Sequence, residues 1–188
     1  MSIFDANLQQ QEANFEPLSP VSFLRRAAQI APAHTAVIHG DRRYTYAQFY
    51  ERSCRLASAL SQHGIKQGDC VAIMGANTPE MLEAHNGVPM LGAVLNSLNI
   101  RLDPRTIAFI LEHGEARVLL TDCGFFDTVR EALGLIDREL LVVDIDDTMS
   151  TGGERLGALD YENLLAEGDP KFAPEPLLNE WQIGRAHV

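Results

Sequence analysis

Short apolar runs recur at nearly regular intervals through the middle of the chain, separated by segments in which apolar residues follow helical spacing. The four runs are Cys70–Met74, Ala93–Leu98, Arg117–Thr121 and Leu140–Val143, and successive runs start about 23 residues apart. Strands that alternate with helices at this interval form βαβ units, whose right-handed crossovers build a parallel sheet. The pattern therefore predicts an α/β fold, with a mostly parallel sheet and helices on both faces.

Three helices are predicted to begin with a cap residue that is followed directly by proline, the preferred residue at the first helical position. These starts are Ser19-Pro20, Thr78-Pro79 and Asp103-Pro104. The longest predicted helix covers residues 46–63, with Thr45 as its cap and Gly64 as its left-handed stop. Pro89 is predicted to kink or end the helix that follows Pro79, because proline has no N–H to donate to the preceding turn.

A β-hairpin is predicted before the longest helix, where the turn pair Gly40-Asp41 separates two β-capable stretches at 36–39 and 43–45. Two shorter helices are predicted over 125–133 and 161–166. Residues 1–18 are rich in Gln, Asn and Glu and lack apolar periodicity, so we expect a lead-in segment there.

The composition excludes several classes of function. The chain is 46% hydrophobic and 22% charged, as is typical of a soluble globular domain. Its 26 acidic and 15 basic residues give a net charge of -11, which argues against a nucleic-acid partner or an anionic membrane surface. No transmembrane segment is expected, because no window reaches the length of a spanning apolar helix. Cys54, Cys70 and Cys123 show no C-x-x-C spacing, which favours reduced thiols and a cytoplasmic location.

Two common nucleotide-binding motifs are absent from the sequence. None of the 14 glycines has another glycine two positions on, so the dinucleotide fingerprint is missing. Lys66 and Lys171 are the only lysines, and neither follows a glycine as the lysine of a Walker loop does. Phosphate binding of either kind is therefore not predicted for this chain.

Asp144 and Asp146 form the sharpest local pattern of chemical interest. They follow an apolar run, as in the first motif of haloacid-dehalogenase-type phosphatases, which the stretch Leu140–Thr148 resembles. In that resemblance Asp144 would be the nucleophile and Asp146 the acid/base, with Mg²⁺ between phosphate and protein. That family needs further groups on later strands, yet only 40 residues follow Thr148. The plainer interpretation is a strand that ends in a solvated acidic turn.

Three stretches resemble, in order and spacing, motifs of adenylate-forming acyl-CoA synthetases. Arg43–Phe49 resembles the family's first core motif, and Gly92–Asn99 resembles its second. Val71–Asn77 resembles the strand and asparagine turn between them. Each stretch is weak evidence alone, but three in register over about sixty residues identify the chain as similar to the N-terminal part of such an enzyme.

The resemblance also implies domain boundaries and a substrate class. Residues 19–183 would form a partial N-terminal AMP-binding domain. Leu82–Met90 and Asn99–Leu102 are most similar to ligases that act on fatty or other small carboxylic acids. Residues 184–188 depart abruptly from the family pattern, and the end of the chain looks like a translated sequencing adapter. We therefore expect an artefactual tail on a fragment of an enzyme about three times longer.

The family reaction implied by the resemblance has two steps, in which a carboxylate and ATP give acyl-adenylate and the CoA thiol then displaces AMP. ATP, Mg²⁺, CoA and a small carboxylic acid would be the partners of the full-length protein. The Ser/Thr/Gly-rich phosphate loop lies beyond Trp181 in the family and is missing here, so we expect this chain alone to be inactive. By its match to the family's Asn-x-Arg-Leu stretch, Arg101 would reach a CoA phosphate.

Two other interpretations remain open at this point. The chain would be a free-standing, non-catalytic α/β domain if its reading frame ended naturally after Val188. The other alternative is the phosphatase hypothesis on Asp144 and Asp146. For Arg101 the alternatives are a solvated loop arginine or a partner of Asp103.

Overall fold

The computed structural model describes residues 19–150 and 152–175. The lead-in expected at 1–18 and the tail expected at 184–188 lie outside the described residues. The helices are α1 (Pro20–Ile30), α2 (Tyr46–Gln62), α3 (Pro79–Met90), α4 (Pro104–His113), η1 (Cys123–Phe125, a short 3-10 turn), α5 (Phe126–Leu133) and α6 (Tyr161–Glu167). The strands are β1 (Thr35–His39), β2 (Arg42–Thr45), β3 (Cys70–Met74), β4 (Val94–Ser97), β5 (Ala116–Asp122), β6 (Leu141–Ile145) and β7 (Leu159–Asp160).

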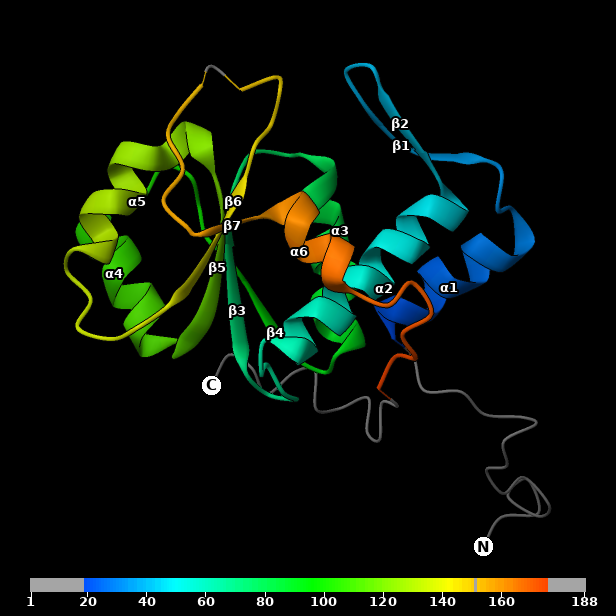
Figure 1. The fold of residues 1–188 in the computed structure, drawn as a ribbon, viewed down its shortest axis with the longest axis horizontal. Coiled ribbons are helices and arrows are strands. Elements are labelled where there is room, and N and C mark those ends of the chain that lie inside the picture. Colours follow the sequence, from blue (N-terminus) through cyan, green and yellow to red (C-terminus); the bar gives the residue numbers. More distant parts are fainter. Residues whose placement is uncertain (1–18, 151, 176–188) are drawn as a thin grey trace, which may run out of the picture.

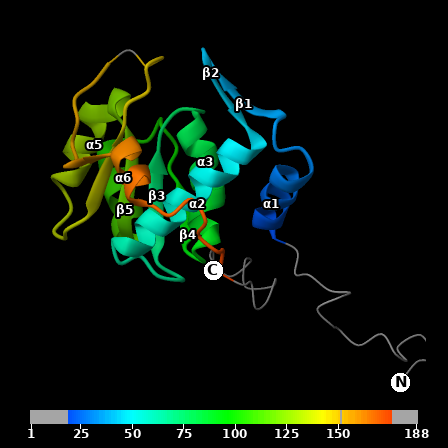
Figure 2. The same ribbon diagram turned by 45° about the vertical axis from the view of Figure 1, so that its right-hand side comes forward.

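Five strands form one parallel sheet in the order β4-β3-β5-β6-β7, and β1 and β2 form a separate antiparallel hairpin. Helices α4 and α5 cover one face of the sheet, while α2, α3 and α6 cover the other (Figure 1). Helix α1 lies outside α2 on that second side, as the turned view also shows (Figure 2). The predicted α/β class, with helices on both faces, is confirmed.

Successive residues of the central strands supply two separate cores, because side chains alternate across a strand. On β3, Ile73 packs toward α2, α3 and α6, whereas Met74 packs toward α4 and α5. On β5, Leu120 and Leu119 divide in the same way. All four side chains are completely buried. The near-continuous apolar runs in the sequence therefore follow from a sheet that is covered on both faces.

Most helix ends lie where the cap residues in the sequence predicted them. The Ser19 hydroxyl accepts the Val21 amide, and Thr45 forms a capping box with Gln48 at the start of α2. Gly64 adopts a φ of 82°, a left-handed conformation suited to a helix stop. Helix α3 ends at Met90, one residue past the proline that was predicted to end it.

The last part of the sheet differs from the prediction in two ways. Strand β6 continues to Ile145, so Asp144 is a buried strand residue and does not belong to a solvated turn. The two-residue strand β7 was not predicted, because it is too short to show a periodicity. Among the described residues, no helix is long and apolar enough to cross a membrane.

Candidate ligand-binding edge

The carboxyl ends of the parallel strands meet at one edge of the sheet, which lies at the top of Figure 1. The chain leaves β3 toward α3 on one face and leaves the neighbouring β5 toward α5 on the other. Open α/β sheets bind ligands in the crevice at such a switch point. The candidate site is therefore the carboxyl edge, and its residues lie on the loops that follow these strands.

Asp122 ends β5 at the switch point. Its side chain is buried, and its Oδ1 accepts the Gly124 amide at 2.8 Å. Burial raises the pKa of this carboxyl, and the nearby carboxylates of Asp147 and Glu80 raise it further. Gly75, directly after β3, lies opposite Asp122, and an added Cβ there would be 3.6 Å from the Asp122 Cβ, an ordinary van der Waals distance. The β5 side of the carboxyl edge is thus acidic.

Four polar residues from separate segments form a cluster at this edge, which we call the edge cluster: His39, Arg42, Glu80 and Asp147. Arg42 donates to Glu80 at 2.6 Å and to Asp147 at 3.3 Å, and His39 Nε2 lies 2.9 Å from Asp147 Oδ1. The edge cluster connects the β1–β2 hairpin to the start of α3 and to the loop after β6. The sequence did not reveal this cluster, because no motif links the hairpin to Glu80 and Asp147, which lie far from it along the chain.

The two carboxylates of the edge cluster are buried. Side-chain exposure is 4% for Glu80 and 5% for Asp147. Burial opposes ionisation of Asp147, but hydrogen bonds from His39 and the Met149 amide, together with Arg42, lower its pKa below the usual value. Arg42 Nε and Glu80 Oε2 are buried without a hydrogen-bond partner among the described residues. The cluster therefore stabilises the packing of the hairpin against α3 and the loop after β6, and part of its hydrogen-bonding capacity is unused.

Arg101, the residue predicted to meet a CoA phosphate, lies at the same edge, in the loop between β4 and α4. Its side chain is exposed and makes no ion pair with a residue in the described ranges. Asp103 is not its partner, because that carboxylate caps α4 by accepting from Arg105 and Thr106. The guanidinium is thus free to meet a ligand, and its role in CoA binding stays a prediction.

The two aspartates of the phosphatase hypothesis have different surroundings. Asp144 is fully buried and accepts the backbone amides of Leu156 and Gly157 at 3.0 and 2.8 Å. Asp146 is exposed and lies 3.4 Å from an Arg155 nitrogen. Within the described parts of the chain, no group of three acidic, histidine or cysteine side chains is placed to hold a metal ion. Asp144 therefore serves to hold the β6–β7 connection.

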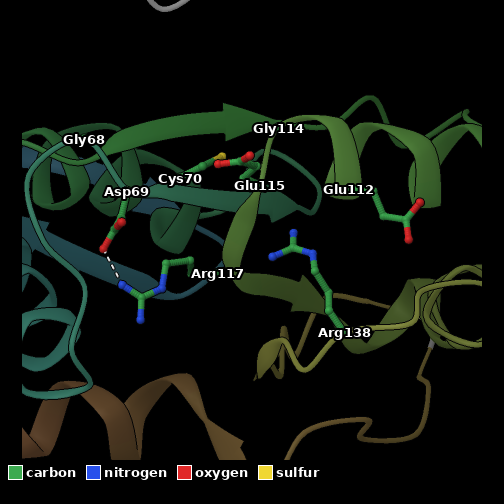
Figure 3. Close-up of a pocket in the computed structure, with 8 residues that line it drawn as sticks. All are labelled: Gly68, Asp69, Cys70, Glu112, Gly114, Glu115, Arg117 and Arg138. Carbon is green, nitrogen blue, oxygen red and sulfur yellow. Dashed lines mark hydrogen bonds and ion pairs between the residues drawn. The ribbon is translucent and has the colours of Figure 1, made fainter.

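A groove lies at the opposite, amino edge of the sheet (Figure 3). It has a volume of about 610 Å³ and is lined by Gly68, Asp69, Cys70, Glu112, Gly114, Glu115, Arg117 and Arg138. Arg117 donates to the Gly64 carbonyl after α2 and pairs with Asp69 at 2.6 Å, while Arg138 donates to the Leu111 carbonyl in the last turn of α4. Both arginines stabilise helix C-termini. A structural role therefore accounts for the two arginines that line the groove.

The fold and the open carboxyl edge define the class: an α/β domain of the kind that binds its ligand at the ends of parallel strands. The family model described as AMP-binding enzyme matches residues 24–179, and the chain belongs to this family. The resemblance stated from three short stretches is therefore confirmed.

Curated relatives extend well beyond this chain. The peroxisomal acetate/butyrate–CoA ligase of Arabidopsis thaliana is 44% identical over 182 residues, which are 90% of this chain and 32% of that protein. The acetate–CoA ligase of Humulus lupulus is 42% identical over 188 residues, covering 94% of this chain and 33% of the relative. The chain thus spans about a third of the length of the curated relatives it matches.

A solved structure shares the fold. The anthranilate CoA ligase in complex with anthranoyl-AMP superimposes with a TM-score of 0.78 at 21% identity, over 89% of this chain and 32% of that one. At this identity the likeness concerns the fold alone. The comparison therefore supports the α/β architecture described above.

Proposed function

We propose that the whole protein is an ATP-dependent acyl-CoA ligase and that residues 19–183 belong to the N-terminal domain of that enzyme. The observation that carries this proposal is the family match over residues 24–179, together with the CoA-ligase names of the relatives. The carboxyl edge supports it, because that edge is where this class of sheet binds ligands.

The proposed reaction proceeds through a mixed anhydride. A carboxylate oxygen attacks the α-phosphorus of ATP, the bond to the bridging oxygen breaks, and pyrophosphate leaves. The CoA thiol then loses its proton and attacks the acyl carbon, and AMP leaves with the bonding electron pair. The products are acyl-CoA, AMP and pyrophosphate.

We identify no residues for Mg²⁺ or the triphosphate within the described ranges. These ranges contain no three-residue cluster of metal-ligating side chains and no glycine-rich phosphate loop. No step is therefore assigned to either group in this part of the protein. We propose that phosphate binding belongs to sequence beyond Trp181 and that the 188-residue chain alone is inactive.

CoA differs, because Arg101 suits one of its phosphates. A guanidinium stays charged at physiological pH and matches phosphate oxygens with two parallel N–H donors. The proposal is supported by the exposure of this side chain at the carboxyl edge. In the full-length enzyme, Arg101→Ala should raise the KM for CoA more than it lowers ATP–pyrophosphate exchange, since CoA enters only after adenylation.

The proposed substrate is a small carboxylic acid. The two relatives act, by their names, on acetate or butyrate, and the chain is more than 40% identical to each. A cytoplasmic location is also proposed, on the basis of three cysteines that form no disulfide. Because the Arabidopsis relative is described as peroxisomal, fractionation should compare these two compartments.

A test begins with the contiguous reading frame. A frame that continues past Val188 into a Ser/Thr/Gly-rich loop supports the ligase, and a verified stop there supports a free-standing domain. The full-length protein should then exchange pyrophosphate into ATP only when acetate, butyrate or another carboxylate is present. Exchange without a carboxylate, or none with any of them, would contradict the proposal.

A further inference from the structure

The loop that carries Arg101 is a tight turn built by one side chain. The Leu102 amide donates to the Asn99 carbonyl at 3.2 Å, which closes a four-residue turn. Inside that turn, the Asn99 side-chain oxygen accepts the Arg101 amide at 2.9 Å. Asparagine favours the first position of such turns because its short side chain reaches the backbone two residues on. Asn99 thus holds the backbone of the residue that bears the guanidinium.

Both ends of the turn are anchored in the protein. Leu98 is buried, and its amide donates to the Ile73 carbonyl of β3 at 2.8 Å. Leu102 packs against the core formed with α4 and α5. The two residues at the tip, Ile100 and Arg101, are exposed and have no such packing. The tip is therefore held by two hydrogen bonds, the backbone bond that closes the turn and the bond to the Asn99 side chain.

The charge of Arg101 is not used inside the described structure. Six other arginines pair with carboxylates: Arg42, Arg52, Arg55, Arg117, Arg130 and Arg155. Asp103 lies only two residues away, yet both of its oxygens accept hydrogen bonds at the start of α4. A guanidinium held on an anchored turn at the ligand edge, with no internal partner, is arranged to meet an anion from outside.

We infer that Asn99 is a positioning residue for Arg101 in the binding of a CoA phosphate. The inference rests on the CoA role proposed for Arg101. Holding the turn in one conformation before CoA arrives reduces the conformational entropy lost on binding. Without the Asn99 acceptor the tip samples other conformations, and the guanidinium spends less time in its binding position. Loss of one hydrogen bond of this kind corresponds to about a three- to tenfold weaker interaction.

The test uses the full-length enzyme and two substitutions at one position. Asn99→Ala removes the acceptor, whereas Asn99→Ser keeps a hydroxyl that makes the same turn more weakly. Asn86→Ala is the matched control, because Asn86 also bonds a backbone group, the Leu82 carbonyl at 2.9 Å, but does so on α3. The readouts are the KM for CoA in thioester formation and the rate of ATP–pyrophosphate exchange, which reports the fold and the first half-reaction.

We expect Asn99→Ala to raise the KM for CoA about three- to tenfold, Asn99→Ser to have a smaller effect, and Asn86→Ala to have none. In the double variant with Arg101→Ala, the Asn99 substitution should add little, because its effect passes through that guanidinium.

If Arg101→Ala raises the KM but Asn99→Ala does not, the positioning role is overturned and the proposed function stands. An equal loss of exchange and CoA use would overturn it as well, by showing a general structural role. If Arg101→Ala itself has no effect, the CoA role fails and the positioning role fails with it.

Discussion

A buried carboxyl on α3 should make the stability of this protein depend on pH. Glu83 has a side-chain exposure of 1% and is held by groups from two other helices. Arg52 on α2 donates to both of its oxygens at 2.6 and 3.2 Å, and the Tyr161 hydroxyl on α6 donates at 3.0 Å. Arg52 also pairs with the exposed Glu162 at 2.6 Å. The network joins the three helices that cover one face of the sheet.

Burial raises the pKa of Glu83 from 4.5 to about 7, with Glu80 adding to the rise and Arg52 and Tyr161 opposing it. The folded state therefore binds more protons than the unfolded state between these two pH values. It follows that the free energy of unfolding falls as the pH rises through this window. At about 1.4 kcal/mol for each pH unit, the full effect is about 3 kcal/mol.

Urea denaturation of the purified chain at pH values from 4 to 8, followed by far-UV circular dichroism, measures this dependence. Glu83→Gln removes the titrating group. The free energy of unfolding of the wild type should therefore fall relative to that of the variant as the pH rises. Glu51→Gln is the control, because Glu51 pairs with Arg55 at 3.0 Å on the exposed face of α2. A Glu83→Gln variant that keeps the wild-type pH dependence would show that Glu83 is not the titrating group.

Three further outcomes are expected. Thr45→Ala should cost about 1 kcal/mol of stability in urea denaturation by removing the capping box of α2, and no loss would contradict the cap. Gly87→Ala should cost about 1–3 kcal/mol in the same assay, because an added Cβ would lie 2.8 Å from the Ser53 carbonyl oxygen where α3 packs on α2. An unchanged midpoint would show that α3 can move away from α2 without loss of stability. The 188-residue chain should not exchange pyrophosphate into ATP, and exchange above a no-protein control would contradict the placement of the phosphate site beyond Trp181.

Much of the fold could be predicted because its signals are local. Pro20, Pro79 and Pro104 each follow a cap residue, and each begins a helix of the structure. The regular spacing of apolar runs identified four of the five parallel strands. β7 has only two residues, so no pattern could reveal it. The end of β6 was missed because acidic residues favour a turn, whereas Asp144 is buried by accepting two loop amides.

The candidate site was less predictable, because it is assembled from distant segments. His39 and Arg42 meet Asp147 across more than 100 positions of sequence, and no spacing rule connects them. Arg101 was identified by a family resemblance, whereas the turn that holds it needed the structure. Sequence motifs thus indicated the family, and packing decided which charged side chains pair internally and which are exposed at the carboxyl edge.

Direct detection of the product tests whether the full-length protein is an acyl-CoA ligase. The full-length protein should be incubated with ATP, Mg²⁺, CoA and either acetate or butyrate, and the thioester measured by mass spectrometry. We expect acyl-CoA together with AMP, both dependent on ATP and on the carboxylate. Absence of any thioester across short-chain, aromatic and long-chain acids, from a protein that is folded and complete, would contradict it.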